Sequence, residues 1–190
     1  MSFVTFQGCK NATVTNARLI QTELHRAPAI RLTTWPFEAA TQDNLVENIR
    51  FLYEGPEDYE GFQNPALIGI SIDAKRGTSI SRNTFENIYM ERVTAGIYIR
   101  HPRSFIDETA GYIEGNMFSN IVVKNFVDLV EFDWPAYNSV ININYNLFSC
   151  LRGIATGNVQ GGVSLIAGIG NHFDHFVIEN WEAGRTYDAD

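Results

Sequence analysis

The amino-acid sequence predicts an all-β fold, a parallel β-helix (solenoid) of about six coils with loop insertions. The first supporting observation is a pattern of asparagine and apolar residues that repeats through the chain. The second is a short alternating strand that follows most copies of the pattern. The third is that helical spacing is nowhere sustained, so no helix is expected. We assign residues 1–190 to a single β-helix domain, because this length suits one hydrophobic core.

The repeat is defined by five positions counted from its first residue. The copies begin at Gln7, Asn44, Asn83, Asn116, Asn138 and Asn171. Two positions later stands an apolar residue: Cys9, Val46, Phe85, Phe118, Val140 or Phe173. Apolar residues return at offsets five and seven, and this alternation with polar residues is typical of strands. The variable distance between copies predicts loops of different length that leave the corners of a regular coil.

The fourth offset carries a second polar column. It contains Asn11, Asn48, Asn87, Asn120, Asn142 and His175. Asparagine tolerates the left-handed backbone of tight corners, and its amide can both donate and accept hydrogen bonds. Because neighbouring coils lie ~4.8 Å apart, we expect Asn48, Asn87, Asn120 and Asn142 to stack on consecutive coils. Their amides should bond to each other or to adjacent buried backbone.

The strands that follow the repeats complete the predicted coils. They are residues 29–32, 70–73, 97–100, 130–133 and 153–156. The residues expected to face the core are Phe85, Ile88, Phe118, Ile121, Val123, Val140, Ile143 and Phe173. A Greek-key or jelly-roll sandwich remains the alternative fold, since it also uses short strands and recurring turns.

Composition narrows the classes of partner. Apolar residues make up 45% of the chain and charged residues 19%, which indicates a folded protein. The net charge of −8 disfavours nucleic acid, whose phosphates are bound by clustered Lys and Arg. No apolar run approaches the ~18–20 residues that span a bilayer, so no membrane partner is expected. Cys9 and Cys150 fall on distant coils and are expected to be unpaired.

The motif Asn-x-Phe-x-Asn-Ile-x-Val, seen at residues 116–123, resembles the right-handed, single-stranded parallel β-helix proteins of the pectate-lyase-like superfamily. That superfamily includes bacteriophage tailspikes and many polysaccharide-degrading enzymes. The resemblance implies a polysaccharide or cell-surface glycan as partner, and an extracellular or virion location. It also implies either a homo-oligomer, such as a trimer, or a part of a larger chain. The family's polygalacturonase motifs and calcium-binding aspartates are absent, so the resemblance specifies architecture better than activity.

Candidate site residues come from the outward positions of the strands after each repeat. Aligning the strands on their apolar residues places Ser71, Tyr98 and Glu131 in one exposed column. The next column contains Asp73, Arg100 and Asp133. Glu131 and Asp133 would be ~6.6–7 Å apart by strand rise, within the range of the two carboxylates of inverting glycosidases. They are therefore the candidate catalytic pair, with Asp73, Tyr98 and Arg100 in substrate binding.

Trp134 and Tyr137 follow these columns and would add aromatic surface for a sugar ring. The expected function is carbohydrate recognition of the tailspike or receptor-binding type, with or without glycoside hydrolysis. One alternative is a non-catalytic structural or adhesive solenoid, in which the Asp–Arg–Asp column is only a solvated ladder of ion pairs. The other is a polysaccharide lyase, disfavoured because neither Lys nor a second Arg accompanies Arg100. No cofactor and no metal are expected, since His175 falls in the corner column.

Overall fold

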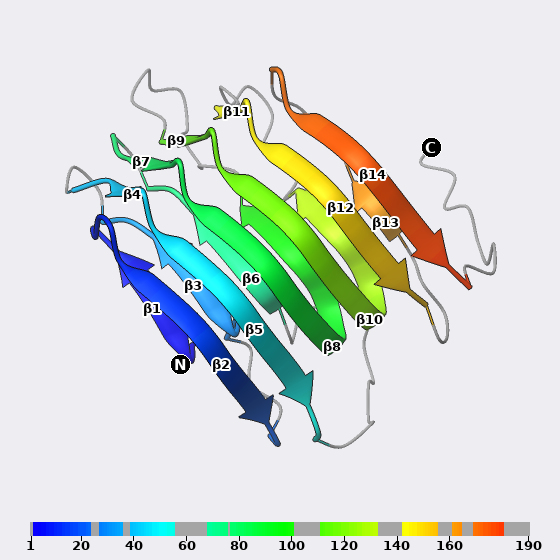
Figure 1. The fold of residues 1–190 in the computed structure, drawn as a ribbon. Coiled ribbons are helices and arrows are strands. Elements are labelled where there is room, and N and C mark those ends of the chain that lie inside the picture. Colours follow the sequence, from blue (N-terminus) through cyan, green and yellow to red (C-terminus); the bar gives the residue numbers. More distant parts are fainter. Residues whose placement is uncertain are drawn as a thin grey trace, which may run out of the picture.

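The protein is a parallel β-helix, as predicted from its sequence. The computed structural model describes residues 2–23, 27–35, 39–55, 68–75, 77–100, 111–132, 142–155, 161–164 and 169–180. The residues in these ranges form strands and no helix, and every pair of neighbouring strands is parallel. The strands stack side by side along one direction, from the N-terminal to the C-terminal end (Figure 1).

The front face of the solenoid carries the strands that begin each repeat. They are β2 (Thr13–Gln21), β5 (Leu45–Tyr53), the first part of β8 (Thr84–Arg100), the first part of β10 (Met117–Phe132), β12 (Leu147–Ile154) and β14 (His172–Glu179). These strands pair in that order, and Figure 1 shows them as the near layer. Val46, Phe85, Phe118, Phe148 and Phe173 occupy one register position on successive strands.

The rear face carries β1 (Val4–Gln7), β3 (Ile30–Thr33), β6 (Ile68–Asp73), the second parts of β8 and β10, and β13 (Gly161–Ser164). These strands also pair in order. β8 and β10 contribute to both faces, and each has a left-handed residue between its two parts, Arg92 with φ 61° and Asn125 with φ 54°. A short third sheet joins the faces and consists of β4 (Thr41–Gln42), β7 (Ser79–Ser81), β9 (Tyr112–Glu114) and β11 (Ile143–Asn144).

The core lies between these faces and is built of stacked columns. Most of the predicted core residues are buried: Phe85, Ile88, Phe118, Ile121, Val123 and Ile143. Phe173 is partly buried against the core, and Val140 lies outside the described residues. The rings of Phe85, Phe118, Phe148 and Phe173 stack nearly parallel, with centroids 4.9, 4.8 and 4.4 Å apart. Aromatic stacking thus follows the coil spacing.

Left-handed residues at one offset explain why the apolar positions fall at two, five and seven. Asn16, Asn48, Asn87, Asn120, Cys150 and His175 all have φ between 50° and 56°. A strand residue normally points to the face opposite its neighbour. The left-handed residue at offset four shifts this alternation by one, so that offsets two and five both face the core. The positions that face outward on this sheet are therefore offsets one, three, six and eight.

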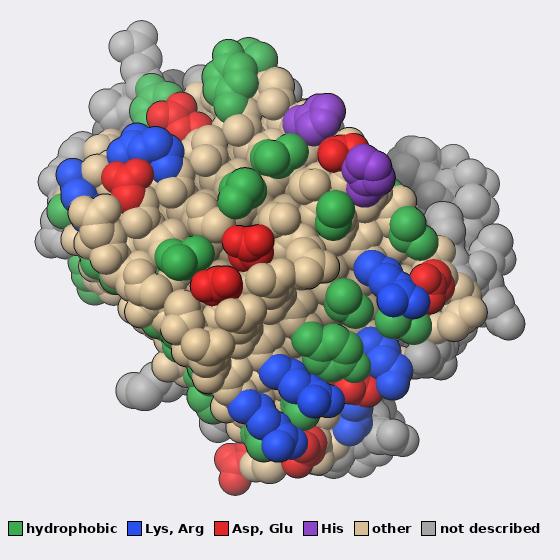
Figure 2. All heavy atoms as spheres, viewed as in Figure 1, with side chains coloured by type: hydrophobic (Ala, Val, Ile, Leu, Met, Phe, Trp, Pro, Cys, Tyr) green, Lys and Arg blue, Asp and Glu red, His purple; other side chains and the backbone are tan. Residues whose placement is uncertain are grey.

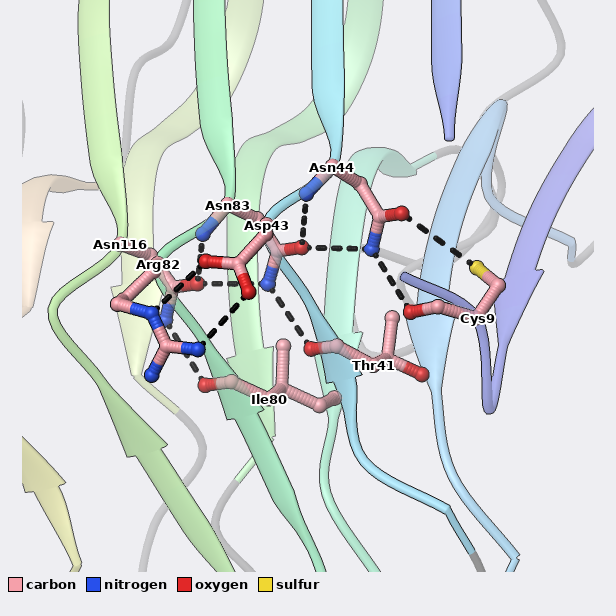
Figure 3. Close-up of polar contacts among 8 residues, drawn as sticks. All are labelled: Cys9, Thr41, Asp43, Asn44, Ile80, Arg82, Asn83 and Asn116. Atoms are coloured by element: carbon pink, nitrogen blue, oxygen red, sulfur yellow. Dashed lines mark hydrogen bonds and ion pairs between the residues drawn. The ribbon is translucent and has the colours of Figure 1, made fainter. Parts of the chain in front are cut away.

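The first residue of each repeat forms a buried asparagine ladder (Figure 3). The side-chain oxygen of Asn83 accepts hydrogen bonds from the main-chain N–H and the side-chain amide of Asn44, at 3.1 and 2.8 Å. Asn83 donates in the same way to Asn116, and the ladder continues through Asn146 to Asn171. Each of these side-chain amides also donates to a main-chain carbonyl, for example Asn116 to that of Ile80. These buried polar groups are fully partnered, which stabilises every corner on this edge.

The ladder corrects two of the predicted repeat starts. The first copy begins at Ala12 and not at Gln7, because the N–H of Ala12 donates to Asn44. The fifth begins at Asn146 and not at Asn138, so Cys150 rather than Asn142 occupies the left-handed column. The predicted stacking holds for Asn48, Asn87 and Asn120, with the side chain of Asn120 donating to that of Asn87 at 2.6 Å. Asn48 and Asn120, however, are exposed and do not form the buried network.

One predicted strand was also placed on the wrong face. Residues 153 and 154 are the end of β12 on the front face, whereas the rear strand at this level is β13. The other strands predicted to follow the repeats coincide with β3, β6 and the second parts of β8 and β10. The thiols of Cys9 and Cys150 are both free.

Asp128 is a carboxylate on the rear part of β10 whose environment is apolar. It lies in register with Ala95 on β8, which in turn lies in register with Ile68 on β6, and both of these residues are buried. Burial raises the pKa of Asp128 to about 6, because removal from water disfavours the charged form. The folded protein therefore binds this proton more tightly than the unfolded chain does. The free energy of unfolding should fall as the pH rises through the interval from about 4 to 6.

Asp128→Asn removes the charge and should raise the free energy of unfolding by about 1–2 kcal/mol above pH 7. The difference from wild type should shrink toward zero below about pH 4, where the aspartate is protonated in both states. Urea unfolding at several pH values measures this. Glu114→Gln, at an exposed position on β9, serves as the control. A difference for Asp128→Asn that does not vary with pH would contradict the prediction.

Candidate functional site

The outward positions of the rear face gather the predicted site residues into two adjacent columns. Ser71, Tyr98 and Glu131 share one register position, as predicted, and Arg31 precedes them on β3. Thr33, Asp73 and Arg100 share the position two residues farther along. The columns are held in place by their inward neighbours Ile70, Ile72, Ile97 and Ile99, each with no exposed surface. The positions of Asp133, Trp134 and Tyr137 lie outside the described residues.

The predicted exposure of these columns is wrong for two members. Asp73 is only 4% exposed and Ser71 only 7%, whereas Tyr98, Arg100 and Glu131 are half-buried. Ser71 is a small residue between the longer side chains of Arg31 and Tyr98 on neighbouring strands. The carboxylate of Asp73 is covered by cations that reach over it. This part of the rear face is therefore a packed polar surface and not a solvated ladder.

Asp73 is the centre of a charged cluster. Its Oδ2 atom lies 3.4 Å from Nη2 of Arg31 and forms a second ion pair with Nζ of Lys75. The hydroxyl of Thr33 donates to the main-chain carbonyl of Asp73 at 3.2 Å. A buried carboxylate needs such partners, because an unpaired charge out of water is costly. The side chains of Arg31 and Lys75 remain about one-third exposed, so both cations are also open to a ligand.

Sequence reasoning missed Arg31 and Lys75 as members of this site. The strand 29–32 was predicted, and aligning its isoleucine with Ile70 would have placed Arg31 beside Ser71. Lys75 follows the end of β6, and no repeat position marks it. Their presence also removes the reason for disfavouring a lyase, since a second Arg and a Lys do accompany Arg100.

The arrangement offers a tyrosine ring among hydrogen-bonding groups of both charges. Tyr98 lies between Ser71 and Glu131 in its column, and Arg31 and Arg100 occupy nearby positions. Such a surface can contact the apolar face of a sugar ring and bond the hydroxyl groups at its rim. The same groups could bind a carboxylate-bearing sugar through the guanidinium groups. Of the two proposed catalytic carboxylates, the structure describes that of Glu131, whereas Asp133 lies outside the described residues.

β14 carries two histidines, His172 and His175, together with Asp174. Nδ1 of His175 lies 2.7 Å from Oδ1 of Asp174, and both side chains are well exposed. Across the described ranges, no group of three or more His, Cys, Asp or Glu residues could hold a metal ion. The same part of the chain contains no helix long and apolar enough to cross a membrane.

Comparison of the chain with protein-family models, with curated proteins and with solved structures finds no match in any of the three.

Proposed function

We propose that this protein recognises a polysaccharide or cell-surface glycan through the rear face of its β-helix. The observation that carries the proposal is the column Arg31–Ser71–Tyr98–Glu131, beside Asp73 and Arg100, on a rigid parallel sheet. Rigid strands hold the side chains in fixed positions, which lowers the entropic cost of binding. The resemblance of the repeat motif to pectate-lyase-like β-helices supports the same class of ligand. Trp134 and Tyr137, a few residues beyond Glu131 in the chain, belong to the proposed site.

Tyr98→Ala tests the proposal. A glycan array with the wild-type protein identifies a ligand, and calorimetric titration with the soluble oligosaccharide then measures the affinity. Loss of the ring should weaken binding about 10-fold or more, because a central aromatic contact is commonly worth over 1 kcal/mol. Tyr145→Ala is the matched control, since Tyr145 is 65% exposed and directly precedes Asn146, at the corner that leads to the front face. Equal affinities for both variants, or no glycan bound by wild type, would overturn the proposal.

Three versions of this function differ in the products that wild type releases from its ligand. A hydrolase would use Glu131 and Asp133 as acid and base and release new reducing ends. A lyase would also release reducing ends, but its β-elimination leaves a carbon–carbon double bond that absorbs ultraviolet light. Binding without either product would identify an adhesive solenoid.

The lyase version has one specific observation in its favour. Arg31 and Lys75 bring two cations to Asp73, in addition to Arg100 at the adjacent register position. A lyase substrate carries a carboxylate next to the carbon that loses its proton, and cations stabilise the negative charge that develops there. The glycan array also distinguishes the three versions, because the lyase version requires that the bound glycan contain an acidic sugar.

A further inference from the structure

The front face presents apolar residues at outward positions, where a solvated sheet would carry polar ones. Leu45, Met117 and Leu147 lie at offset one, Val122 and Val177 at offset six, and Ile154 at offset eight. All six are at least partly exposed, and Val177 is 50% exposed. Figure 2 looks onto this face and shows hydrophobic side chains distributed across it between charged ones. Isolated apolar side chains are common on any protein surface, so the charges of this face are the better indication of a partner.

Two outward columns of this face carry charges of a single sign, whereas the column at offset eight carries both, with Lys124 paired to Glu91. Glu47 and Glu86 occupy adjacent positions at offset three, with Asp174 farther along the same column. Arg18, Arg50 and Arg152 occupy offset six. Glu47 and Glu86 are neighbours on paired strands, and like charges at such positions destabilise a sheet. Within the described part of the chain, neither carboxylate has an ion-pair or hydrogen-bond partner, so a cationic partner from outside this chain would relieve the repulsion.

Arg50 is suited to serve as that partner from a second copy. Its side chain is exposed and its guanidinium lies 5.2 Å from the ring centre of Tyr89, which orients it along the face. Its own strand carries Glu47 three residues earlier. The same face therefore contains both an unpaired acid and an exposed base, which is what a self-complementary surface requires.

We propose that two copies of this chain associate through their front faces around a twofold axis parallel to the stacking direction. Rotation about this axis reverses the strand direction but keeps each strand at the level of its equivalent. With the axis between offsets three and six, offset three of one copy faces offset six of the other. Offset one then faces offset eight. Packed sheets lie ~10 Å apart, a distance that side chains from both faces fill.

This arrangement brings together one pair of unlike charges and one pair of apolar residues, each of them twice in the dimer. Glu47 faces Arg50 of the second copy. Leu147 faces Ile154, and both of these side chains are partly exposed. No like charges meet. A twofold axis along the strand direction would instead keep the columns and reverse the levels, which sets Arg50 against Arg152. Of these two orientations, the first is the one that pairs Glu47 with Arg50.

The area of the face is close to that of ordinary dimers. The ladder from β2 to β14 measures roughly 24 Å at ~4.8 Å per strand, and its eight-residue strands measure roughly 26 Å. Their product is a flat area of about 600 Å² per copy. Side chains make the true surface larger than this flat area, so it approaches the ~800 Å² that each partner buries in a standard interface. A dimer of moderate affinity that weakens with added salt is expected.

Charge reversal tests both the face and the symmetry, with sedimentation velocity over a range of concentrations as the readout. Glu47→Arg alone sets Arg against Arg50, and Arg50→Glu alone sets Glu against Glu47, twice per dimer. Each single variant should weaken association at least about 100-fold. The double variant E47R/R50E should dimerise again. A mixture of the two single variants should form a heterodimer, because the Arg-only face then meets the Glu-only face.

Glu114→Arg, which reverses an exposed charge on the third sheet, is the control and should dimerise like wild type. Cross-linking gives an independent measurement. Cys150 lies in the left-handed column, next to the proposed axis. In the variant Cys9→Ser it is the remaining cysteine, so a short bismaleimide should link the Cys150 side chains of the two copies. A wild-type monomer, a trimer, or a dimer that the single reversals leave intact would each overturn the proposal. These outcomes are independent of glycan binding, which is assigned to the opposite face.

Discussion

Replacing Phe118 with alanine should lower the free energy of unfolding by about 3–5 kcal/mol. Phe118 has no exposed surface, and its ring stacks between those of Phe85 and Phe148 at interplanar angles of 5° and 4°. Removing it leaves a cavity that the neighbouring coils cannot close, because strand pairing fixes their spacing. Urea denaturation monitored by circular dichroism measures the change.

Phe3→Ala provides the matched control for this substitution. Phe3 is 48% exposed, and its ring makes an edge contact with that of Phe51, with centroids 6.2 Å apart. Its removal should therefore cost about 1 kcal/mol or less. Equal losses for the two variants would show that the phenylalanine stack contributes nothing beyond ordinary surface contact.

Asn116→Leu should be at least as damaging, with an expected loss of about 3–6 kcal/mol. The side chain of Asn116 accepts from the main-chain N–H and the amide of Asn83, and donates to the carbonyl of Ile80. Leucine has a similar size but makes none of these bonds, nor the one that Asn116 donates to Asn146. The side-chain amide of Asn83 keeps its bond to the carbonyl of Thr41, and each bond lost from a buried group costs ~1–3 kcal/mol. The thermal midpoint and the urea midpoint should both fall.

Asn120→Leu distinguishes the buried ladder from the exposed asparagine column. Asn120 is exposed and donates one side-chain bond to Asn87, while its φ of 50° is unfavourable for leucine. A loss of about 1–2 kcal/mol is expected from backbone strain and that one bond. If Asn120→Leu proved more damaging than Asn116→Leu, the assignment of the stabilising ladder to the first repeat position would be wrong.

The apolar columns could be predicted from the sequence because each coil must bury the same positions. Phe85, Phe118 and Phe173 share their offset for this reason, and the rear columns of Tyr98 and Glu131 follow from the same register. The first copy was misplaced because Ala12 stands where later copies have asparagine. The corner at Ala12 is recognised only by its main-chain N–H, which donates to Asn44, and a pattern of side chains does not show that bond.

The fifth copy was misplaced for a different reason. Cys150 replaces asparagine in the left-handed column, and its side chain is exposed. The requirement at that column is only the backbone conformation, which several residue types adopt at modest cost. A pattern of side chains is a weak guide to such a position. Asn138 and Asn142 then matched the pattern better than Asn146, although Asn146 is the residue buried in the ladder.

The candidate site was predictable in its register but not in its burial. Strand alternation gives which side chains share a face, and it placed Ser71, Tyr98 and Glu131 correctly. Whether Asp73 is open to solvent depends instead on how far Arg31 and Lys75 reach from a neighbouring strand and from the strand end. Long, flexible side chains determine this exposure by the partners that they reach in the folded protein, and the periodicity of the sequence does not specify those partners.

The asparagine ladder has a direction, and this bears on how the chain folds during translation. The N–H of each corner donates to the asparagine of the coil that is synthesised next, as Asn44 does to Asn83, 39 residues later. At ~5–20 residues per second, that acceptor leaves the ribosome roughly 2–8 s after its donor. The last coil of a nascent solenoid therefore always has a corner N–H whose acceptor has not yet been synthesised. A pause in synthesis between two ladder asparagines prolongs the exposure of an unpaired strand edge to other chains.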